Sequence, residues 1–326
     1  MICSLCSAHL LVVLSASAAV ASLDWPEWPY YPGPQNCSTR AMPAVLDKDA
    51  STKLDIVHVV YSSNSNKKNL ALLLQSMISL SRNLQHPDRC VIHLLVAKVD
   101  MTNLQGLVAC FRHELATHSA IPKVQLHEMR TIQLNISDPR RLDIAQNTYF
   151  RYYVHLLLHE EVPRALVLDA DTTIKADVTP MYQMHMEHPI AAVRVHWPIE
   201  HIKNMFQLGA EIRHPDALAF NAGVLLYDLA RWRSEDFTRA LEAWTPLTSR
   251  FLYDQTPLNI VFQDKADALD WRWNVLHLGW AMVARRCFNR GRILHWNGPQ
   301  KHLGRNGRYR HLVDPYLPKR QCAVLQ

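Results

Sequence analysis

The N-terminus of this 326-residue chain lacks charge: no Asp, Glu, Lys or Arg occurs from Met1 to Leu23. Every residue from Leu10 to Ser22 is apolar or small, and this run is short for a membrane span. Ala19-Val20-Ala21 fits the small-x-small pattern of a signal peptidase site, so residues 1–21 are predicted to be a cleaved signal peptide. An uncleaved signal anchor is the alternative, because the basic residues that usually precede such a run are missing.

Closely spaced cysteines are also lacking after Cys3 and Cys6 of the signal segment, which argues against a zinc knuckle. The remaining cysteines are Cys37, Cys90, Cys110, Cys287 and Cys322. We expect one or two disulfides and a leftover thiol, in a pairing that the sequence does not fix. Two N-x-S/T sequons, at Asn36 and Asn135, agree with an oxidising lumen. The predicted location is therefore the secretory pathway, in the ER or Golgi lumen or outside the cell.

A large excess of charge is absent as well. The formal net charge is +6, and the basic residues from Arg285 to Arg310 fit a solvated surface with one or two positions for a phosphate. This charge is compatible with an anionic ligand but is smaller than the basic excess typical of nucleic-acid-binding proteins, so no nucleic-acid partner is expected. Contact with a membrane is expected only through the N-terminal segment, if that segment stays uncleaved.

Strands and helices alternate along the chain after a lead-in or stem at residues 22–53 that is rich in proline and aromatic residues. The alternation predicts parallel β/α units, hence an α/β fold, in one domain over residues 54–318 followed by a tail at 319–326. Strands are predicted at Ile56–Tyr61, Val91–Val96, Val124–His127, Ala165–Leu168, Ile190–Val195 and Ala219–Tyr227. Helices are predicted at Asn69–Asn83, Leu104–His118, Tyr149–Glu161, Ser234–Trp244 and Asp254–Phe262.

Two acidic residues follow the strand at Ala165–Leu168, in the segment Asp169-Ala170-Asp171. Ligands of α/β sheets bind where strands leave the sheet. Alternation along the chain would point both carboxylates the same way, with Ala170 turned inward. Such a pair suits a divalent cation with oxygen ligands. The alternative, a solvated pair of acids in a turn, stays open for these residues taken alone.

A second informative segment is ILHWNGPQK, residues 293–301. His295 offers an imidazole nitrogen, Gly298 allows a tight turn of the backbone, and Lys301 supplies a compact positive charge. Two carboxylates and one imidazole suit Mn²⁺ better than Mg²⁺, although Mg²⁺ is possible. Taken alone, this segment also fits a surface loop.

Together the segments resemble the retaining glycosyltransferases of family 8, which include glycogenin, lipopolysaccharide galactosyltransferases and plant galacturonosyltransferases. Four stretches match in order: NTYFRYYVHLLLHEEVPRALVLDADTTI, FNAGVLLYDLARWR, YDQTPLNIVF with LDWRWNVLHLG, and HWNGPQK. The resemblance implies a GT-A fold, with a Rossmann-like, mostly parallel central sheet, flanking helices and an irregular acceptor half. It also implies a UDP-sugar donor and a glycan, glycolipid or glycoprotein acceptor.

The resemblance further implies roles for single residues. Mn²⁺ would be held by Asp169, Asp171 and His295, and the diphosphate would meet Lys301 and Gly298. Arg151 and Asn221 would also bind the donor, as would Asp169. The implied catalytic residues are Asp254, which like Asn221 would bond the donor sugar, and Gln255, which would lie beside the anomeric carbon.

Simpler structural roles remain open for several of these residues. Arg151 also fits an ion pair on a helix surface, and Asn221 also fits a backbone-capping amide. Asp254 also fits a helix N-cap ahead of Pro257. Trp271 and Trp273 fit the core better than a sugar-stacking face.

The implied reaction breaks the bond between the anomeric carbon and UDP. A double displacement would need a carboxylate nucleophile, and Gln255 is a neutral amide. We therefore expect the acceptor hydroxyl to attack on the face that the diphosphate leaves, which retains the anomeric configuration. An isolated sugar adduct on Asp254 or Gln255 would contradict this.

The sequence departs from the family pattern at three places. Ser62, Ser63 and Asn64 stand where members usually carry an acid that helps hold the uridine. Lys301-His302-Leu303 replaces Lys-Pro-Trp, which predicts a different loop over the diphosphate. Arg194 and its neighbours replace another acid, which predicts either a different sugar, such as an acidic one paired with Arg194, or weaker catalysis.

Two other functions compete. Asp169-Ala170-Asp171-Thr172-Thr173 also fits the signature of haloacid-dehalogenase-type phosphatases, but those enzymes need a downstream Gly-Asp, and no Gly here precedes Asp. A non-catalytic relative that binds UDP-sugar or glycan is the second alternative, motivated by the missing acid after the first strand. A retained metal site argues against it.

Overall fold

The computed structural model describes residues 37, 56–130, 147–206, 212–248, 254–304 and 307–326. The signal segment, both sequon asparagines and the lead-in apart from Cys37 lie outside these residues. In the described part of the chain, no helix combines the length and apolar character needed to cross a bilayer. The predicted signal segment at 1–21 and the domain limits at 54 and 318 stay predictions.

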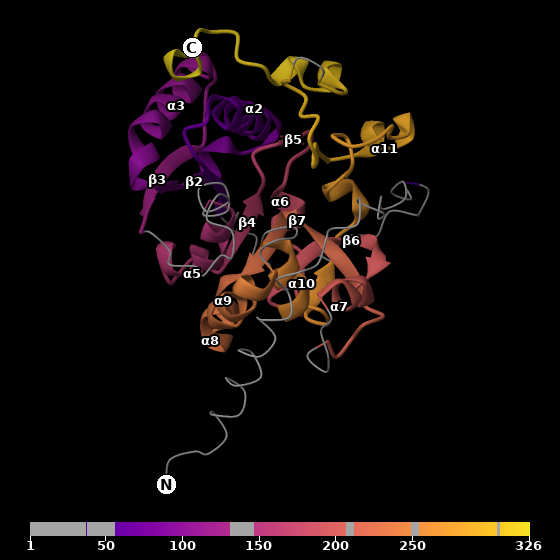
Figure 1. Cartoon of the computed structure of the whole chain (residues 1–326). Coiled ribbons are helices and arrows are strands. Elements are labelled where there is room, and N and C mark those ends of the chain that lie inside the picture. Colours follow the sequence, from indigo (N-terminus) through magenta and orange to yellow (C-terminus); the bar gives the residue numbers. More distant parts are fainter. Residues whose placement is uncertain (1–36, 38–55, 131–146, 207–211, 249–253, 305–306) are drawn as a thin grey trace.

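A seven-stranded sheet forms the centre of the molecule, in the order β3-β2-β1-β4-β7-β6-β8 (Figure 1). β3, β2, β1 and β4 run parallel, as do β6 and β8. β7 runs antiparallel to both of its neighbours, β4 and β6. The predicted mostly parallel sheet is therefore confirmed. Its strands are β1 Val57–Ser63, β2 Cys90–Ala97, β3 Lys123–Met129, β4 Arg164–Leu168, β6 Ile190–Pro198, β7 Leu218–Asp228 and β8 Ala266–Ala268.

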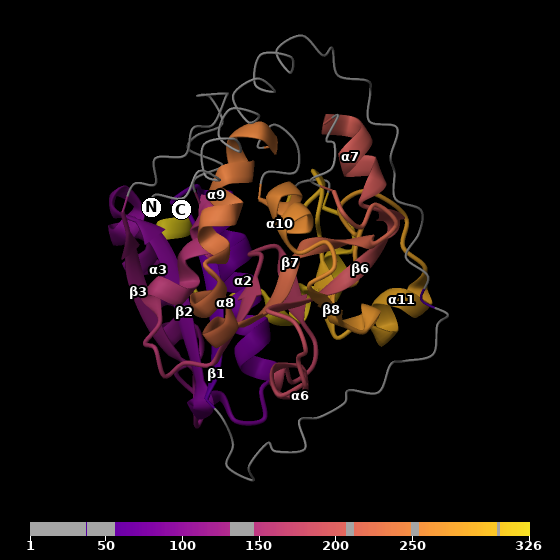
Figure 2. The ribbon, with the colours of Figure 1, turned by 90° about the horizontal axis from the view of Figure 1, so that it is seen from below.

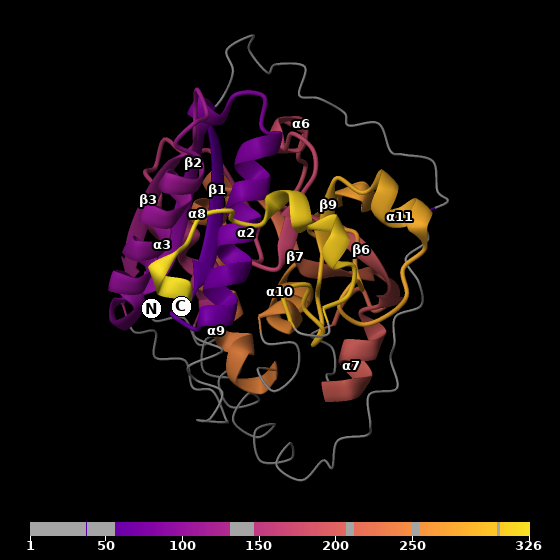
Figure 3. The ribbon, with the colours of Figure 1, turned by 90° about the horizontal axis from the view of Figure 1, so that it is seen from above.

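Two long helices, α2 (Lys67–Asn83) and α3 (Met101–Glu114), cover one face of the parallel half of the sheet (Figures 1 and 3). α2 begins two residues before the predicted Asn69, because the side chain of Asn66 caps it by accepting a hydrogen bond from the backbone N–H of Lys68 at 3.0 Å. Alternate side chains of β1 and β2 point to this face and join the helices in one apolar core.

The C-terminal segment crosses α2 and ends beside α3 (Figure 3). The carboxylate of Glu114 accepts hydrogen bonds from the backbone N–H groups of Lys319 at 3.0 Å and Arg320 at 3.1 Å. A disulfide joins Cys110 of α3 to Cys322. The predicted tail at 319–326 is therefore fixed to the domain.

The opposite face of the sheet carries α8 (Leu229–Glu235), α9 (Phe237–Thr248) and α10 (Gln255–Val261) (Figure 2). The core on this side is rich in aromatic rings. Trp232 of α8 is 1% exposed and stacks on Tyr227 of β7, with 4.5 Å between ring centroids. This packing fixes α8 against the antiparallel half of the sheet.

The helix predicted over Tyr149–Glu161 is wrong in extent. The chain forms a 3₁₀ helix, η5 (Phe150–Tyr153), and one α-turn, α5 (Val154–Leu157), and then extends at Leu158. The reason is the guanidinium of Arg233, which donates to the carbonyls of five residues in this stretch: His155, Leu158, His159, Glu160 and Val162. Carbonyls that a longer helix would satisfy internally are satisfied from α8 instead.

The single helix predicted over Ser234–Trp244 is also wrong. Asp236 adopts a left-handed backbone with φ of 49° and separates α8 from α9. α8 starts earlier than expected because the side chain of Asp228 accepts a hydrogen bond from the backbone N–H of Arg231 at 3.0 Å. Aspartate tolerates the left-handed conformation better than most residues, and this allows the break.

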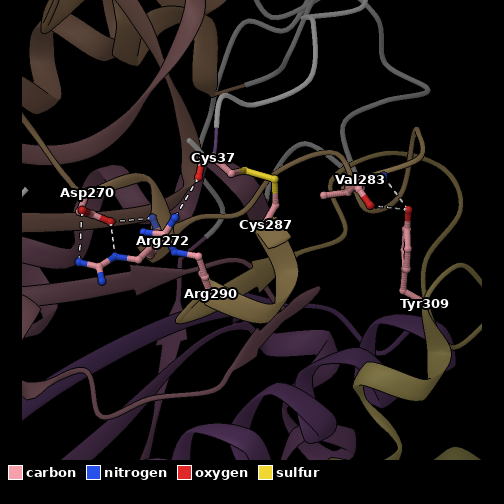
Figure 4. Close-up of a disulfide and its surroundings, with 7 residues drawn as sticks. All are labelled: Cys37, Asp270, Arg272, Val283, Cys287, Arg290 and Tyr309. Atoms are coloured by element: carbon pink, nitrogen blue, oxygen red, sulfur yellow. Dashed lines mark hydrogen bonds and ion pairs between the residues drawn. A yellow bond between two sulfur atoms is a disulfide. The ribbon is translucent and has the colours of Figure 1, made fainter. Parts of the chain in front are cut away.

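A second, two-stranded sheet pairs β5 (Thr172–Ile174) with β9 (Ile293–His295) in antiparallel register, so that Thr172 lies opposite His295. Beside it, α11 (Arg285–Arg290) is joined to the lead-in by the Cys37–Cys287 disulfide (Figure 4). Arg290 also donates to the carbonyl oxygen of Cys37 at 3.3 Å. The two disulfides leave Cys90 as a buried free thiol, in agreement with the expected one or two disulfides.

Candidate active site

Three side chains that could bind a metal meet at the end of β4. Asp169 directly follows β4, Asp171 precedes β5, and the pairing of β5 with β9 brings His295 to them across the intervening chain. The imidazole Nε2 of His295 lies 3.3 Å from Asp171 Oδ1 and 3.6 Å from Asp169 Oδ2. The three ligand atoms lie within 4.8 Å of one another. Both carboxylates face the same imidazole, as predicted, but the cause is the turn at 169–171 between β4 and β5 and not the alternation of a strand.

The residues fit a divalent cation. Two carboxylate oxygens and one neutral imidazole nitrogen can converge on one point, and this donor set suits Mn²⁺. The Asp169 side chain is 33% exposed while that of His295 is 2% exposed, so one side of the cluster faces solvent. Further coordination positions are therefore available on that side to a ligand from solution.

Gly223 of β7 lies directly beneath this cluster. A Cβ atom at this position would come within 2.7 Å of His295 Nδ1 and 2.9 Å of Asp169 Oδ2. The backbone N–H of Asp169 donates to the carbonyl of Gly223 at 2.9 Å. The strand can approach the ligands this closely only because the residue has no side chain.

A chain of amides fixes the tautomer of His295. Backbone N–H groups of β7 donate to Gln255 Oε1 at 3.0 Å and to Asn221 Oδ1 at 3.0 Å, which identifies both atoms as oxygens. Asn221 Nδ2 donates to Gln255 Oε1, and Asn274 Nδ2 donates to Asn221 Oδ1, each at 2.9 Å. Asn274 Oδ1 must then accept from Nδ1–H of His295, 3.0 Å away. The lone pair of Nε2 is thereby directed at the two carboxylates.

Arg151 connects the metal cluster to the acid at the start of α10. Its side chain is 4% exposed and lies 2.6 Å from Asp169 Oδ1 and 2.9 Å from Asp254 Oδ2. It also donates to the carbonyls of Ala222 and Thr148. Burial would lower the pKa of Arg151, but the two carboxylates outweigh this effect and raise it. The alternative of an ion pair on a helix surface is therefore wrong: the ion pairs are buried.

Asp254 occupies the N-cap position of α10, but its side chain makes no capping hydrogen bond. Its carboxylate is turned to Arg151 instead. Burial raises the pKa of Asp254, Arg151 lowers it and Asp169 raises it, which together give about 6. The residue is thus close to its titration point at neutral pH.

Lys301 lies against the metal cluster from the solvent side. Its ammonium contacts Asp171 Oδ2 and donates to the carbonyl of Trp296 at 2.9 Å. Burial would raise the pKa of Asp171, but the ammonium of Lys301 outweighs this effect and lowers it. Gly298 turns the chain just before Lys301 with a φ of 113°, a conformation that other residues rarely adopt. Both predicted diphosphate contacts therefore lie in one short segment beside the carboxylates.

The departure at His302 has a structural explanation. His302 is fully buried, packs on Trp296 with 4.4 Å between ring centroids, and lies 2.9 Å through Nε2 from Gln75 Oε1 of α2. Gln75 in turn donates to Thr173 of β5 at 3.0 Å. Burial is the main cause that lowers the pKa of His302 to about 4, so the ring is neutral at pH 7. The residue after Lys301 is therefore tied to α2 by a side-chain hydrogen bond.

The other two departures are also accounted for. In the turn after β1, Ser65 donates its backbone N–H to Asp100 Oδ1 at 2.9 Å, and its hydroxyl contacts the same atom. A carboxylate that follows β2 therefore orders the turn that lacks its own acid. Arg194 donates to the carbonyls of Leu218 at 2.7 Å and Ala266 at 2.6 Å, so it links strands of the sheet.

Trp271 and Trp273 belong to the core side of their segment, as the sequence favoured. Trp273 is 5% exposed, and the guanidinium of Arg292 lies 4.7 Å from its ring centroid. Trp271 is partly buried against the core and faces Arg290 at 5.5 Å. Each is a cation–π contact.

The sequence model of glycosyl transferase family 8 matches residues 53–302. This chain belongs to that family. Probable galacturonosyltransferase-like 8 of Arabidopsis thaliana is 25% identical over 294 residues, which cover 83% of this chain and 74% of the relative. Glycosyltransferase 8 domain-containing protein 1 of Xenopus tropicalis is 28% identical over 201 residues, which cover 52% of this chain and 54% of the relative. The match to this second relative thus spans about half of the relative's length.

Solved structures agree with the family assignment at the level of the fold. The galactosyltransferase LgtC, solved with donor and acceptor sugar analogs, superposes with a TM-score of 0.58 at 20% identity, covering 79% of this chain and 96% of that chain. Mouse xyloside xylosyltransferase 1 superposes with a TM-score of 0.53 at 17% identity, covering 74% of this chain and 97% of that chain. The family 8 chain therefore has the predicted GT-A fold and is a glycosyltransferase, and the phosphatase alternative is set aside.

The sequence did not indicate several residues that build this family 8 site. Gly223 and Asn274 lie inside two of the matching stretches but were given no role there, because their contacts with His295 come from strands distant in sequence. Gln75 and Asp100 lie outside those stretches altogether. A polar residue in an apolar helix, as Gln75 is in α2, is the one signal that could have drawn attention to it.

Proposed function

We propose that this family 8 enzyme is a retaining, Mn²⁺-dependent transferase that moves a hexosyl, pentosyl or uronosyl group from a UDP-sugar to a hydroxyl of a glycan or glycoconjugate. The supporting observation is the convergence of Asp169, Asp171 and His295, with Lys301 beside them. Two carboxylates, an imidazole and an ammonium gathered in this way suit a diphosphate bound through a metal ion.

When bound, the cation would stabilise the negative charge that develops on the departing UDP. Lys301 adds a second positive charge on the same side. Asp171 holds that ammonium in place, and a phosphate oxygen would compete for it. Arg151 orients Asp169, because its buried guanidinium holds Asp169 Oδ1 at 2.6 Å.

Retention without a covalent intermediate is supported by the surroundings of Gln255. Its Oε1 accepts two hydrogen bonds, from Asn221 Nδ2 and from the backbone N–H of Ala222. An amide oxygen that is occupied in this way is a poor nucleophile. Asp254 is the nearest carboxylate in sequence, and it is paired with Arg151. Attack by the acceptor hydroxyl on the face that the diphosphate leaves therefore requires no protein nucleophile.

The proposal is tested by measuring release of UDP from UDP-glucose, UDP-galactose, UDP-xylose and UDP-galacturonate in the presence of Mn²⁺ without an acceptor. The donor that raises the melting temperature of the protein most is expected to be hydrolysed slowly. EDTA or Asp171→Ala should abolish this hydrolysis. Asp264→Ala removes an exposed carboxylate and serves as the matched control. Tight binding of a UDP-sugar with no turnover would favour the alternative of a non-catalytic relative.

The location in the secretory pathway remains part of this proposal. Two disulfides join parts of the chain 250 and 212 residues apart, and such bonds persist in oxidising compartments. Mapping of disulfide-linked peptides from protein expressed in a eukaryotic secretory host, together with N-terminal sequencing, would test both the compartment and cleavage after residue 21.

A further inference from the structure

Trp280 is an exposed aromatic residue that packs on Gly298, in the segment that leads to Lys301. It is 43% exposed, whereas Trp232, Trp273 and Trp296 are 1%, 5% and 0% exposed. Met282, two residues further, is 81% exposed. Scattered apolar side chains on a surface need no explanation, but two large ones at the edge of a polar site call for one.

The indole of Trp280 is held against Gly298. A Cβ atom at Gly298 would lie 2.5 Å from Cδ1 and 2.6 Å from Nε1 of the ring. The pyrrole edge of Trp280 therefore packs directly on the backbone of the segment that leads to Lys301. Gly298 serves two purposes here, because its positive φ makes the turn and its lack of a side chain admits the indole.

The turn that carries Trp280 is rigidly built. The backbone N–H groups of Trp280 and Ala281 donate to the carbonyl of His277 at 2.9 and 3.0 Å, and the carbonyl of Gly279 accepts from the N–H of Gln300 at 3.2 Å. A Cβ atom at Gly279 would come within 2.7 Å of the carbonyl oxygen of Asn297. Two segments are thus packed backbone to backbone, and the ring is positioned before any ligand arrives.

The turn lies on the side of the metal cluster away from β1 and β2. Leu276, just before it, packs in a core with Val195 of β6 and Ala219 of β7. In the sheet order these strands lie beyond β4, on the opposite side from β1. A nucleoside held at the turn after β1 would therefore lie on the far side of the metal cluster from Trp280, so that the other substrate is the one that can reach the indole.

We propose that Trp280, bordered by Met282, forms a stacking platform for a pyranose ring of the acceptor. This inference rests on the proposed function and specifies how its second substrate is bound. A pyranose has an apolar face of C–H groups and a rim of hydroxyls, so it matches an exposed indole beside a polar site. The Tyr309 hydroxyl lies 3.9 Å from Met282 Sδ and donates to the carbonyl of Val283, which supports the border of the platform.

The experiment uses the full chain loaded with Mn²⁺ and UDP on an array of defined glycans. The wild-type protein is expected to bind a subset of glycans, and the strongest becomes the probe for solution titration. Trp280→Ala should weaken binding of that glycan by up to about ten-fold, while Trp280→Phe retains most of it. Leu156→Ala, which truncates another exposed apolar side chain, is the matched control and should bind as the wild type does.

Titration of UDP with Mn²⁺ on the same variants separates the two substrates. If Trp280→Ala weakens UDP binding as much as glycan binding, the indole serves the nucleotide and the proposal is overturned. It is equally overturned if the wild type binds no glycan, or if Trp280→Ala binds the probe normally. If the wild type hydrolyses none of the UDP-sugars in the absence of an acceptor, the proposed function itself is contradicted.

Discussion

Gly223 shows how a single absent methyl group can decide whether a metal site exists. The residue sits beneath His295 and Asp169 with no room for a Cβ atom. Gly223→Ala is therefore expected to displace one ligand and to weaken Mn²⁺ binding by about 10–100-fold, as loss of supporting contacts does in other metal sites. Calorimetric titration with Mn²⁺ measures this. Gly304→Ala, where the nearest atom to the new Cβ is 3.3 Å away, is the control and should bind Mn²⁺ normally.

Asp254 makes the stability of the protein depend on pH. Its pKa in the folded state is raised to about 6, mainly by burial, from an ordinary value of 3.8. A raised pKa means that the stabilising contribution is fully present below pH 3.8 and is lost as the pH rises through about 6. The free energy of unfolding of Asp254→Asn minus that of the wild type should therefore increase between pH 4 and pH 7.

Denaturant titrations of both proteins in metal-free buffer at several pH values measure this difference. The part of the substitution's cost that does not depend on pH leaves the slope of this difference against pH unchanged. Each unit by which the folded-state pKa is raised adds about 1.4 kcal/mol to the total change in the difference. A difference that stays flat would show that the pKa of Asp254 is ordinary, and one that falls with pH would show that it is lowered; either result contradicts the expectation.

The amide chain from Gln255 to His295 joins α10, β7, the segment at Asn274 and β9, so it is a property of elements and not of one residue. Asn274→Leu removes the acceptor for Nδ1–H of His295 and leaves the imidazole free to rotate or change tautomer. We expect about 10–100-fold weaker Mn²⁺ binding. Asn274→Asp keeps an acceptor at that position and should lose much less. Equal losses in the two variants would mean that Asn274 acts only through packing.

The hydrogen bond between Gln75 and His302 ties α2 to the segment that carries Lys301. Gln75→Leu removes the partner of a buried imidazole, and we expect Lys301 to be held less firmly beside Asp171. The KM for the UDP-sugar should rise several-fold while kcat changes less, because the loss falls on binding of the diphosphate. Ser81→Ala is the control, since Ser81 is a buried residue of the same helix whose hydroxyl has no partner among the described residues. A change confined to kcat would contradict the expectation.

Elements with a strong local pattern were predictable from the sequence. The strands β1, β2 and β7 and the helix α2 follow from apolar runs and a capping residue, and their limits differ from expectation by only a few residues. The segment at 149–161 was not predictable, because its carbonyls are satisfied by Arg233 from a distant helix. The break at Asp236 depends on one backbone conformation that sequence periodicity does not record.

The same division holds for the site. Asp169, Asp171, His295 and Lys301 could be named from ordered motifs, and the structure brings them together. Their supporting residues could not, because such contacts arise only when β5 pairs with β9, β5 packs on α2, and His295 of β9 lies against Gly223 of β7. The four site residues lie in short motifs that can be recognised in the sequence, whereas the residues that support them come from distant parts of the chain.

At the scale of the molecule, the Cys110–Cys322 disulfide closes a loop of more than two hundred residues and fixes the C-terminal segment to α3. Replacing both cysteines by serine should lower the free energy of unfolding by about 2–5 kcal/mol, chiefly because the unfolded chain gains freedom. Chemical denaturation with and without reductant measures this. In the double variant, reductant should act only through Cys37–Cys287; an unchanged midpoint in the double variant would show that the bond adds nothing.

The Cys37–Cys287 bond has a consequence for where catalysis can occur. Should residues 1–21 stay in the bilayer, only residues 22–36 separate the lipid surface from a point covalently fixed to α11. Fully stretched, that distance is at most about 55 Å. The enzyme would then work within a thin zone above its membrane, and acceptors carried on lipids or on neighbouring membrane glycoproteins would come within reach more readily than those dissolved in the lumen.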